Sequence, residues 1–363
     1  MNNHQVLSNV KPGRRGRYFS LIMLIVLLLI ISGCSSKEKN PGLFSEGLLY
    51  AKQGDSYGYI DKTGTFVINP QFDYAYGFSP NGLAPVANDD KWGYINKKGE
   101  IVIPLQYELA NHFNDGELAV VKMSGKYGFI DKTGKFIINP TFDYAYGFGV
   151  GKLAPVQIGD SWGYINKEGT MVAAPIFSEA DEFYDSELAA VCIDDKWGYI
   201  DESGEIVITP QFDSAASFYH SNLALVSMGG KYGFINKEGT LEINPIYDKA
   251  TIYSIDGLSR VHIAGKYGFI NEKNEFAINP MFDEVGMMFN GYAYINENDK
   301  YGFINNKGEV VVEPQFEPFS EYFSYVGNAR SDGFATVKQN GKYGIINMKG
   351  EFIIQPTFDD LES

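Results

Sequence analysis

The feature that most constrains the fold is an aromatic–glycine pair that recurs at a nearly constant interval. The interval is 35 residues six times, then 34 and then 42. A period of this length is the signature of a repeat architecture, in which each unit is completed by its neighbours. We therefore expect nine copies of one unit in the 363-residue chain, at Tyr57-Gly58, Trp92-Gly93, Tyr127-Gly128, Trp162-Gly163, Trp197-Gly198, Tyr232-Gly233, Tyr267-Gly268, Tyr301-Gly302 and Tyr343-Gly344.

Each unit contains the signature of a β-hairpin. An Ile follows the glycine by two positions in every copy, and Asp or Asn comes next, as in Ile60-Asp61. Three positions later stands Gly, or Asn274 in one copy, and both residue types tolerate positive φ. This span fits a type I turn with a bulge between two strands. Turn chemistry explains the column better than calcium does, because one carboxylate per turn is too few ligands for Ca²⁺.

The rest of the unit predicts the second strand of this hairpin and one further strand. Apolar residues alternate after the turn, as in Phe66 and Ile68, and Pro70 is expected to end that strand. An aromatic, an acidic residue and an Ala follow, which suggests a single helical turn or a compact loop. A further strand such as 82–86 closes the unit. The unit is therefore a three-stranded meander.

The way the units are divided along the chain favours an open array. Counted from the strand at 47–51, nine complete meanders are present with none left over. A closed propeller usually divides one blade between the two chain ends, and its blades have four strands. We therefore expect an all-β repeat protein of nine stacked three-stranded antiparallel meanders in an open, twisted, solenoid-like array. A closed propeller-like ring is the alternative.

The N-terminal segment is typical of a secreted bacterial lipoprotein. Residues 19–31 form an apolar run that is too short for a comfortable transmembrane helix but fits a signal peptide. The run ends in Ser32-Gly33-Cys34, which looks like a bacterial lipobox. We predict a lipoprotein signal peptide at 1–33, a lipid such as palmitate on Cys34, and a flexible tether at 34–42. The basic residues of the leader are Lys11, Arg14, Arg15 and Arg17.

The repeating unit resembles the WG repeat, also called the KWG repeat, of bacterial surface and secreted proteins. Lys91-Trp92-Gly93-Tyr94-Ile95-Asn96 is a nearly ideal copy, and the resemblance spans residues 43–363. The sequence departs from the pattern in carrying Tyr for Trp in six copies and an insertion at 319–333. The resemblance implies a repeat scaffold outside the cytoplasm and no agreed activity.

The sequence offers little to support catalysis. His112, His220 and His262 stand in different columns of the repeat, so surface or edge positions are a better interpretation than a metal or catalytic cluster. No nucleophile elbow, zinc-binding pair or phosphate-binding loop occurs. Once Cys34 is acylated, Cys192 is the one remaining thiol, and its apolar strand predicts burial. We therefore expect no enzymatic activity, no cofactor and no metal.

Charge narrows the possible partners. Residues 1–33 hold four of the 30 basic residues and no acidic one, so the charge falls from −15 for the whole chain to −19 without them. This surplus argues against nucleic acid as a partner, because phosphate binding depends on Lys and Arg.

The aromatic columns divide between core and surface. The columns of Phe72 and Ile60 are expected to fill the space between stacked units. Trp92, Trp162 and Trp197 can belong either to the core or to the surface. Tyrosines that interrupt the apolar spacing are the best candidates for exposed aromatic side chains that bind a ligand: Tyr74, Tyr76, Tyr144 and Tyr146.

Two functional hypotheses follow. The leading one is a non-enzymatic, lipid-anchored scaffold for protein–protein interaction or adhesion on the extracytoplasmic face of a bacterial membrane, attached through Cys34. The alternative is a module that binds cell-wall polysaccharide through exposed aromatic side chains. The sequence leaves open the identity of the partner and the choice between inner and outer membrane.

Overall fold

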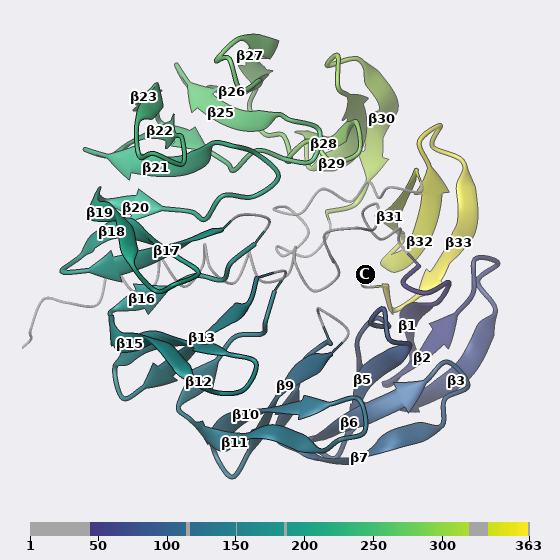
Figure 1. Ribbon diagram of the computed structural model, residues 1–363. Coiled ribbons are helices and arrows are strands. Elements are labelled where there is room, and N and C mark those ends of the chain that lie inside the picture. Colours follow the sequence, from purple (N-terminus) through teal and green to yellow (C-terminus); the bar gives the residue numbers. More distant parts are fainter. Residues whose placement is uncertain (1–43, 114–116, 150, 185–186, 319–332, 362–363) are drawn as a thin grey trace, which may run out of the picture.

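The structure is a computed structural model that describes residues 44–113, 117–149, 151–184, 187–318 and 333–361. In these residues the strands form nine antiparallel sheets that follow one another around a closed ring (Figure 1). Seven sheets have four strands and two have three. The protein is a nine-bladed β-propeller.

Each blade carries one long strand at the rim of the ring (Figure 1), and we number the blades 1 to 9 in the order of these strands. The rim strands are β3 (Phe66–Phe72), β7 (Ile101–Tyr107), β11 (Phe136–Phe142), β15 (Met171–Phe177), β19 (Ile206–Phe212), β23 (Leu241–Tyr247), β27 (Phe276–Phe282), β30 (Val310–Phe316) and β33 (Phe352–Phe358). The third strands carry the aromatic–glycine pairs and are β2 (Ser56–Ile60), β6 (Lys91–Asn96), β10 (Lys126–Asp131), β14 (Ser161–Asn166), β18 (Lys196–Asp201), β22 (Lys231–Ile235), β26 (Lys266–Ile270), β29 (Lys300–Asn305) and β32 (Lys342–Asn347).

From the rim inward, each rim strand is hydrogen-bonded to a third strand, the third strand to a second strand and, in seven blades, the second strand to a short edge strand. The second strands are β1 (Leu49–Gln53), β5 (Leu83–Asn88), β9 (Leu118–Met123), β13 (Leu153–Ile158), β17 (Leu188–Ile193), β21 (Ala224–Met228), β25 (Ser259–Ile263), β28 (Tyr292–Glu297) and β31 (Phe334–Gln339). Seven blades add a two-residue edge strand, namely β34 (Asp360–Leu361), β4 (Tyr74–Ala75), β8 (Leu109–Ala110), β12 (Tyr144–Ala145), β16 (Glu179–Ala180), β20 (Ser214–Ala215) and β24 (Lys249–Ala250).

The ring is closed by the last described residues of the chain, so the expected open array is wrong and the alternative ring is right. In β34, Leu361 and Asp360 pair with Ala51 and Lys52 of β1, which completes blade 1. Two features of a propeller that the sequence seemed to lack, a blade shared by both chain ends and a fourth strand in a blade, are therefore both present. One blade combines both ends of the described chain, and the segment after Phe72, expected as a helical turn or loop, forms the fourth strand of a blade.

The hydrophobic core lies between neighbouring blades. Between blades 1 and 2, Tyr59, Ile68 and Phe72 of the first blade pack against residues of the second that include Ala84, Val86 and Ile95. An equivalent cluster joins blade 9 to blade 1, where Phe358 packs with Leu361. In the described residues every pair of adjacent blades shares such a cluster, so no blade has an unpartnered face. The prediction that the Ile60 and Phe72 columns form the core is confirmed, although Phe282 is only half-buried.

The repeated glycine is required by a close approach to the rim strand. Trp197 pairs with Phe212 and Tyr199 with Ile208. Between these pairs, Gly198 alone opposes the three rim-strand residues 209–211, with Pro210 in the middle. A Cβ atom on Gly198 would lie 2.3 Å from the Ile208 carbonyl oxygen and 2.6 Å from the Pro210 nitrogen. The proline therefore lies inside the rim strand at a bulge, where its missing N–H costs no ladder bond, and does not end the strand as expected.

We expect Gly198→Ala to lower the free energy of unfolding by about 1–3 kcal/mol, as other overpacking substitutions do. Backbone atoms line the space in which the new methyl group would lie, and they cannot rotate away. Gly159→Asn is the matched control, because nothing lies within 4 Å of that Cβ position and Asn tolerates its φ of 63°. Chemical denaturation checks both variants, and an equal loss in the two would contradict this assignment.

Two kinds of polar contact recur from unit to unit, one in the hairpin turn and one at the acidic residue that follows the rim strand. The amide of Gly64 donates to the Asp61 carbonyl at 3.0 Å, and Asn274 takes the glycine position with a φ of 62°, which confirms the predicted turn. The acidic residue that directly follows a rim strand, such as Asp143 after Phe142, links neighbouring blades. Asp143 accepts hydrogen bonds from Lys126 of blade 3 and from the amide of Gly159 in the hairpin of its own blade. It therefore caps the turn between the second and third strands of its own blade.

Candidate binding surface

Tyr74 and Tyr76 are exposed on blade 2, where the edge strand β4 continues along β5. Tyr74 is 55% exposed and Tyr76 38%, whereas Ala75 between them is buried against blade 1. The alternation of a β-strand explains this difference, because it places both tyrosine rings on the face opposite to Ala75. The Tyr59 hydroxyl donates to the Tyr76 carbonyl at 2.8 Å and fixes the backbone below the rings.

Trp92 lies between these two tyrosines. Its ring is 5.2 Å from that of Tyr76 at an interplanar angle of 14°, and 6.1 Å from that of Tyr74 at 25°. The three rings form one nearly parallel stack, which we call the blade 2 stack. Offset stacking contributes about 0.5–1.5 kcal/mol per pair beyond area burial, so the stack is ordered before any ligand binds.

Blade 4 carries a second copy, the blade 4 stack of Tyr144, Tyr146 and Trp162. Tyr146 and Trp162 are 5.2 Å apart at 13°, as in blade 2. Tyr144 stands at 64° to both rings and contacts Tyr127 of blade 3 at 4.7 Å. Tyr144 is 36% exposed, but Tyr146 is only 8% exposed, so the expectation of exposure is confirmed for Tyr144 and wrong for Tyr146.

The two stacks have different titratable neighbours. The His112 ring lies 5.7 Å from Tyr76, and burial lowers the pKa of His112 to about 4, so this neighbour is neutral. Beside the blade 4 stack, burial and the charge of nearby Glu182 raise the pKa of Tyr144. Burial and Tyr144 itself raise the pKa of Tyr127 to about 12. Tyr144 and Tyr127 are therefore neutral at pH 7.

Sequence reasoning missed the buried acidic pair Asp181 and Glu182 on blade 5, which are 5% and 4% exposed. Asp181 accepts hydrogen bonds from the Tyr184 hydroxyl at 2.9 Å and from the amide of Glu182. Burial, and secondarily the charge of Asp181, raise the pKa of Glu182 to about 8. The sequence did contain a signal for this pair, because the equivalent positions of other units are Tyr76-Gly77 and Tyr146-Gly147.

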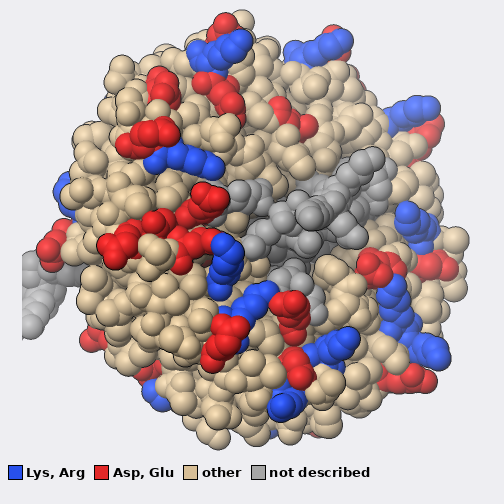
Figure 2. Space-filling view, viewed as in Figure 1, with Lys and Arg blue, Asp and Glu red and all other residues tan. Residues whose placement is uncertain are grey.

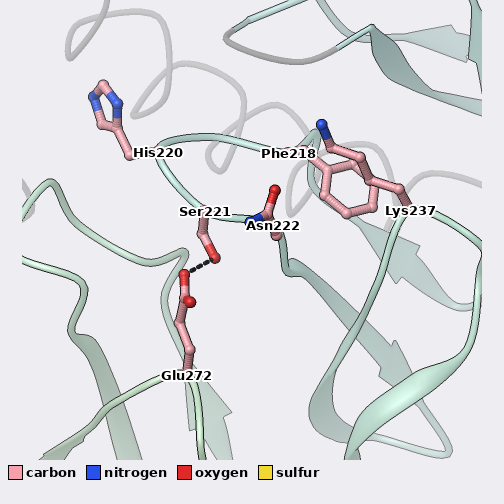
Figure 3. A pocket seen from close by; sticks show the side chains of 6 residues that line it. All are labelled: Phe218, His220, Ser221, Asn222, Lys237 and Glu272. Carbon is pink, nitrogen blue, oxygen red and sulfur yellow. Dashed lines mark hydrogen bonds between the residues drawn. The ribbon is translucent and has the colours of Figure 1, made fainter.

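The three histidines within the described residues lie on different blades. His112 contacts Tyr76, and His262 of β25 lies 3.6 Å from the Asp248 carboxylate. His220 lines a shallow hollow of about 240 Å³ on blades 6 and 7 (Figure 3). There the Ser221 hydroxyl donates to Glu272 at 2.6 Å, while the His220 ring points away from Ser221, so the three groups form no catalytic relay (Figure 3).

No metal centre is evident in the part of the chain that the structure describes, where no three His, Cys, Asp or Glu side chains gather at a site. Nor do these residues include a helix with the length and hydrophobicity of a membrane span. Cys192 is buried, as its strand predicted. The predicted signal peptide, Cys34 and the tether lie outside the described residues, as does nearly all of the 319–333 insertion.

Ion pairs cross between blades on the surface. Lys97 pairs with Glu46 at 2.5 Å and Lys167 with Glu117 at 2.5 Å. On the face shown in Figure 2, acidic and basic side chains lie side by side around much of the ring. Such exposed pairs contribute little to stability, a median of about 0–1 kcal/mol.

Comparison with protein families gives the same repeat. The family described as "WG containing repeat" matches residues 57–92, 92–127, 127–161, 162–197, 197–232, 232–267, 267–301, 301–320, 322–343 and 343–363. The chain belongs to the WG repeat family. The matches at 301–320 and 322–343 share one interval between aromatic–glycine pairs, the one with the insertion, so ten matched segments agree with nine WG blades. A comparison with curated proteins finds no match to this sequence.

Solved structures with a similar fold are propellers of very different sequence. A crystal structure titled as that of the eukaryotic initiation factor has a TM-score of 0.61 at 10% identity and covers 87% of this chain and 96% of its own. A structure titled "Dihydro-heme d1 dehydrogenase NirN in complex with DHE" has a TM-score of 0.44 at 13% identity and covers 88% of this chain and 74% of its own. Hsv2 of Kluyvelomyces marxianus reaches 0.39 at 9%, over 62% and 88%. The first likeness shows the fold alone, and the other two carry no argument.

Proposed function

We propose that this WG-repeat propeller is a non-enzymatic binding scaffold, held by a lipid on Cys34 at the extracytoplasmic face of a bacterial membrane, and that it binds a neutral wall polysaccharide. The observation that carries the proposal is the blade 2 stack, in which the outer ring of Tyr74 is 55% exposed although it lies against Trp92. A large aromatic surface held open to solvent is costly unless it meets a partner.

Stacked aromatic rings suit a sugar. The flat apolar face of a pyranose can lie on an aromatic ring in the way that a nucleobase does, and a base stacked on such a ring contributes about 1–3 kcal/mol. Trp92 and Tyr76 hold Tyr74 in place, so little side-chain entropy is lost on binding. A neutral glycan fits better than an anionic one, because the chain after residue 33 has a charge of −19 and repels anions.

A scaffold for protein interaction is the other hypothesis, and its natural surface is the rim. Val67, Ile176 and Met281 are 52%, 61% and 60% exposed there. Every rim strand contains a proline, however, and this removes an edge N–H that a partner strand would need. Among the residues that the structure describes, the rim has no contact group of three aromatic rings like the two stacks, so we place binding at the stacks.

We expect the variant Tyr74→Ala/Tyr144→Ala to lose at least about tenfold in affinity for neutral wall polysaccharide, since each lost stacking contact costs about 1–3 kcal/mol. Co-sedimentation of the intact chain with insoluble wall polysaccharide measures the loss. Phe276→Ala is the matched control, because Phe276 is a rim ring that is 42% exposed. Unchanged retention of the double variant, or capture that requires wall protein instead of glycan, would overturn the polysaccharide proposal.

A further inference from the structure

We propose that the blade 2 and blade 4 stacks are two subsites for one glycan chain, so that a single linear, neutral oligosaccharide lies across blades 2, 3 and 4. This inference rests on the proposed function. It adds the length of the ligand and the stoichiometry of binding.

The two stacks have the same place in their blades. Tyr74 and Tyr144 begin equivalent edge strands, and Trp92 and Trp162 are the aromatic residues of equivalent third strands. Successive blades of a ring repeat one orientation, so both stacks open toward the same end of the ring. Packed sheets lie about 10 Å apart, which places the stacks about 20 Å from each other. A short oligosaccharide can span this distance, whereas a disaccharide cannot.

Rings extend into the gap from both sides. At one side, His112 of blade 3 lies 5.7 Å from Tyr76. At the other, Tyr127 of blade 3 lies 4.7 Å from Tyr144. Blade 3 itself has no tyrosine in the two columns and places Leu109 and the exposed Asn111 there. Lys122 of β9 pairs with Leu109, and its Nζ atom lies 5.2 Å from the centre of the Tyr127 ring. The surface between the stacks therefore offers an amide and an ammonium group for hydrogen bonding to sugar hydroxyl groups.

The row of rings ends at blade 5. Glu179 and Asp181 stand in the two columns that hold tyrosines in blade 4. Trp197 belongs to the same column as Trp92 and Trp162 but has this acidic neighbourhood instead of tyrosines. The structure therefore limits the binding track to the blades before blade 5, and Trp197 provides a matched control within the same molecule.

Two linked subsites predict a threshold in ligand length. When one sugar unit binds at the first stack, the rest of the chain is held near the second stack at a high effective concentration, provided that it reaches that stack. Affinity should then rise steeply between fragments that are too short and fragments that span both stacks. Fragments beyond that length should gain little more.

The test uses the full-length protein in detergent and neutral glycan fragments, released by partial hydrolysis from the wall polysaccharide of the sedimentation assay and separated by length. Isothermal titration should give one fragment per protein for long fragments and an affinity at least about tenfold above that of short ones. Tyr74→Ala and Tyr144→Ala, made separately, should each reduce the affinity for long fragments to that for short ones. Trp197→Ala should leave both affinities unchanged.

Other outcomes separate the two proposals. Two fragments per protein with an affinity independent of length would show two independent sites, which overturns this inference and leaves the proposed function standing. Absence of binding at every length, together with loss of sedimentation, would overturn both. A Trp197→Ala variant as impaired as Tyr144→Ala would place the track elsewhere and overturn the inference.

Discussion

Removing residues 359–363 is expected to open the ring and to abolish cooperative folding at 37 °C. The deletion removes Leu361, which is fully buried between blades 9 and 1, and the loss of such a side chain alone costs about 2–5 kcal/mol. It also removes hydrogen bonds across the closure, one of them from the Tyr57 hydroxyl to the Asp360 carboxylate at 3.1 Å. The Asp359 amide donates to the Lys52 carbonyl at 3.1 Å, and the Asp359 carboxylate accepts from the Gly54 amide at 3.0 Å and from Lys342.

The measurement is urea unfolding followed by circular dichroism, since total stabilities of folded proteins are only about 5–15 kcal/mol. Leu361→Ala should give a smaller loss of about 2–5 kcal/mol while the chain still folds. Ile353→Ala is the control, because this side chain of the last blade is 46% exposed and its loss should change little. A deletion variant as stable as the intact chain would show that the ends do not hold the ring together.

Raising the pH from about 5 to about 9 is expected to destabilise the protein, and Glu182→Gln should remove much of this dependence. The pKa of Glu182 is raised in the folded state from 4.5 to about 8, so the folded chain binds a proton there that the unfolded chain has released. Stability therefore falls as the pH rises above the unfolded value, and the loss is complete above about 8. Its size is on the order of 4 kcal/mol, at about 1.4 kcal/mol per pH unit.

The physical cause is the ionisation of Glu182 beside Asp181 in a site where both carboxyl groups are buried. Gln keeps the shape of the protonated acid without its charge. Thermal unfolding between pH 5 and pH 9 checks the prediction, with the exposed Glu205→Gln as control. A parallel decline in Glu182→Gln and the intact chain would assign the effect to other groups.

Below pH 4 stability should fall as well, because the lysine partners of Asp143 and Asp213 hold the pKa of these carboxyl groups below their ordinary value.

The repeat and its hairpins could be predicted from the sequence because their causes are local. The turn at Asp61 needs only its own four residues, and Ile60 is buried in every copy of its column. Closure could not be predicted in this way. It depends on Asp360 and Leu361, and a two-residue strand has no periodicity that distinguishes it from a loop. The same weakness hid the edge strands of the other blades.

The candidate site was found in part. Tyr74 and Tyr144 interrupt the apolar spacing, and both are exposed. Burial of Tyr146 depends on Trp162, 16 residues away in the sequence, whose ring packs parallel to it. The burial of Glu182 depends on neighbouring blades, and a pattern within one repeat cannot show it. The contact of Tyr146 with Trp162 forms when blade 4 folds, whereas the burial of Glu182 also requires the neighbouring blade.

The two stacks open toward the same end of the molecule because the blades form a closed ring. A disulfide between strands β1 and β34, at the two ends of the described chain, tests this closure most directly. Lys52 and Asp360 are directly opposed in neighbouring strands, a geometry that a disulfide can bridge. The variant Lys52→Cys/Asp360→Cys should form this bond under mild oxidation in the folded monomer, as peptide mapping by mass spectrometry detects. A folded, monomeric double variant in which both thiols stay reduced, or link only between molecules, would contradict the closed propeller.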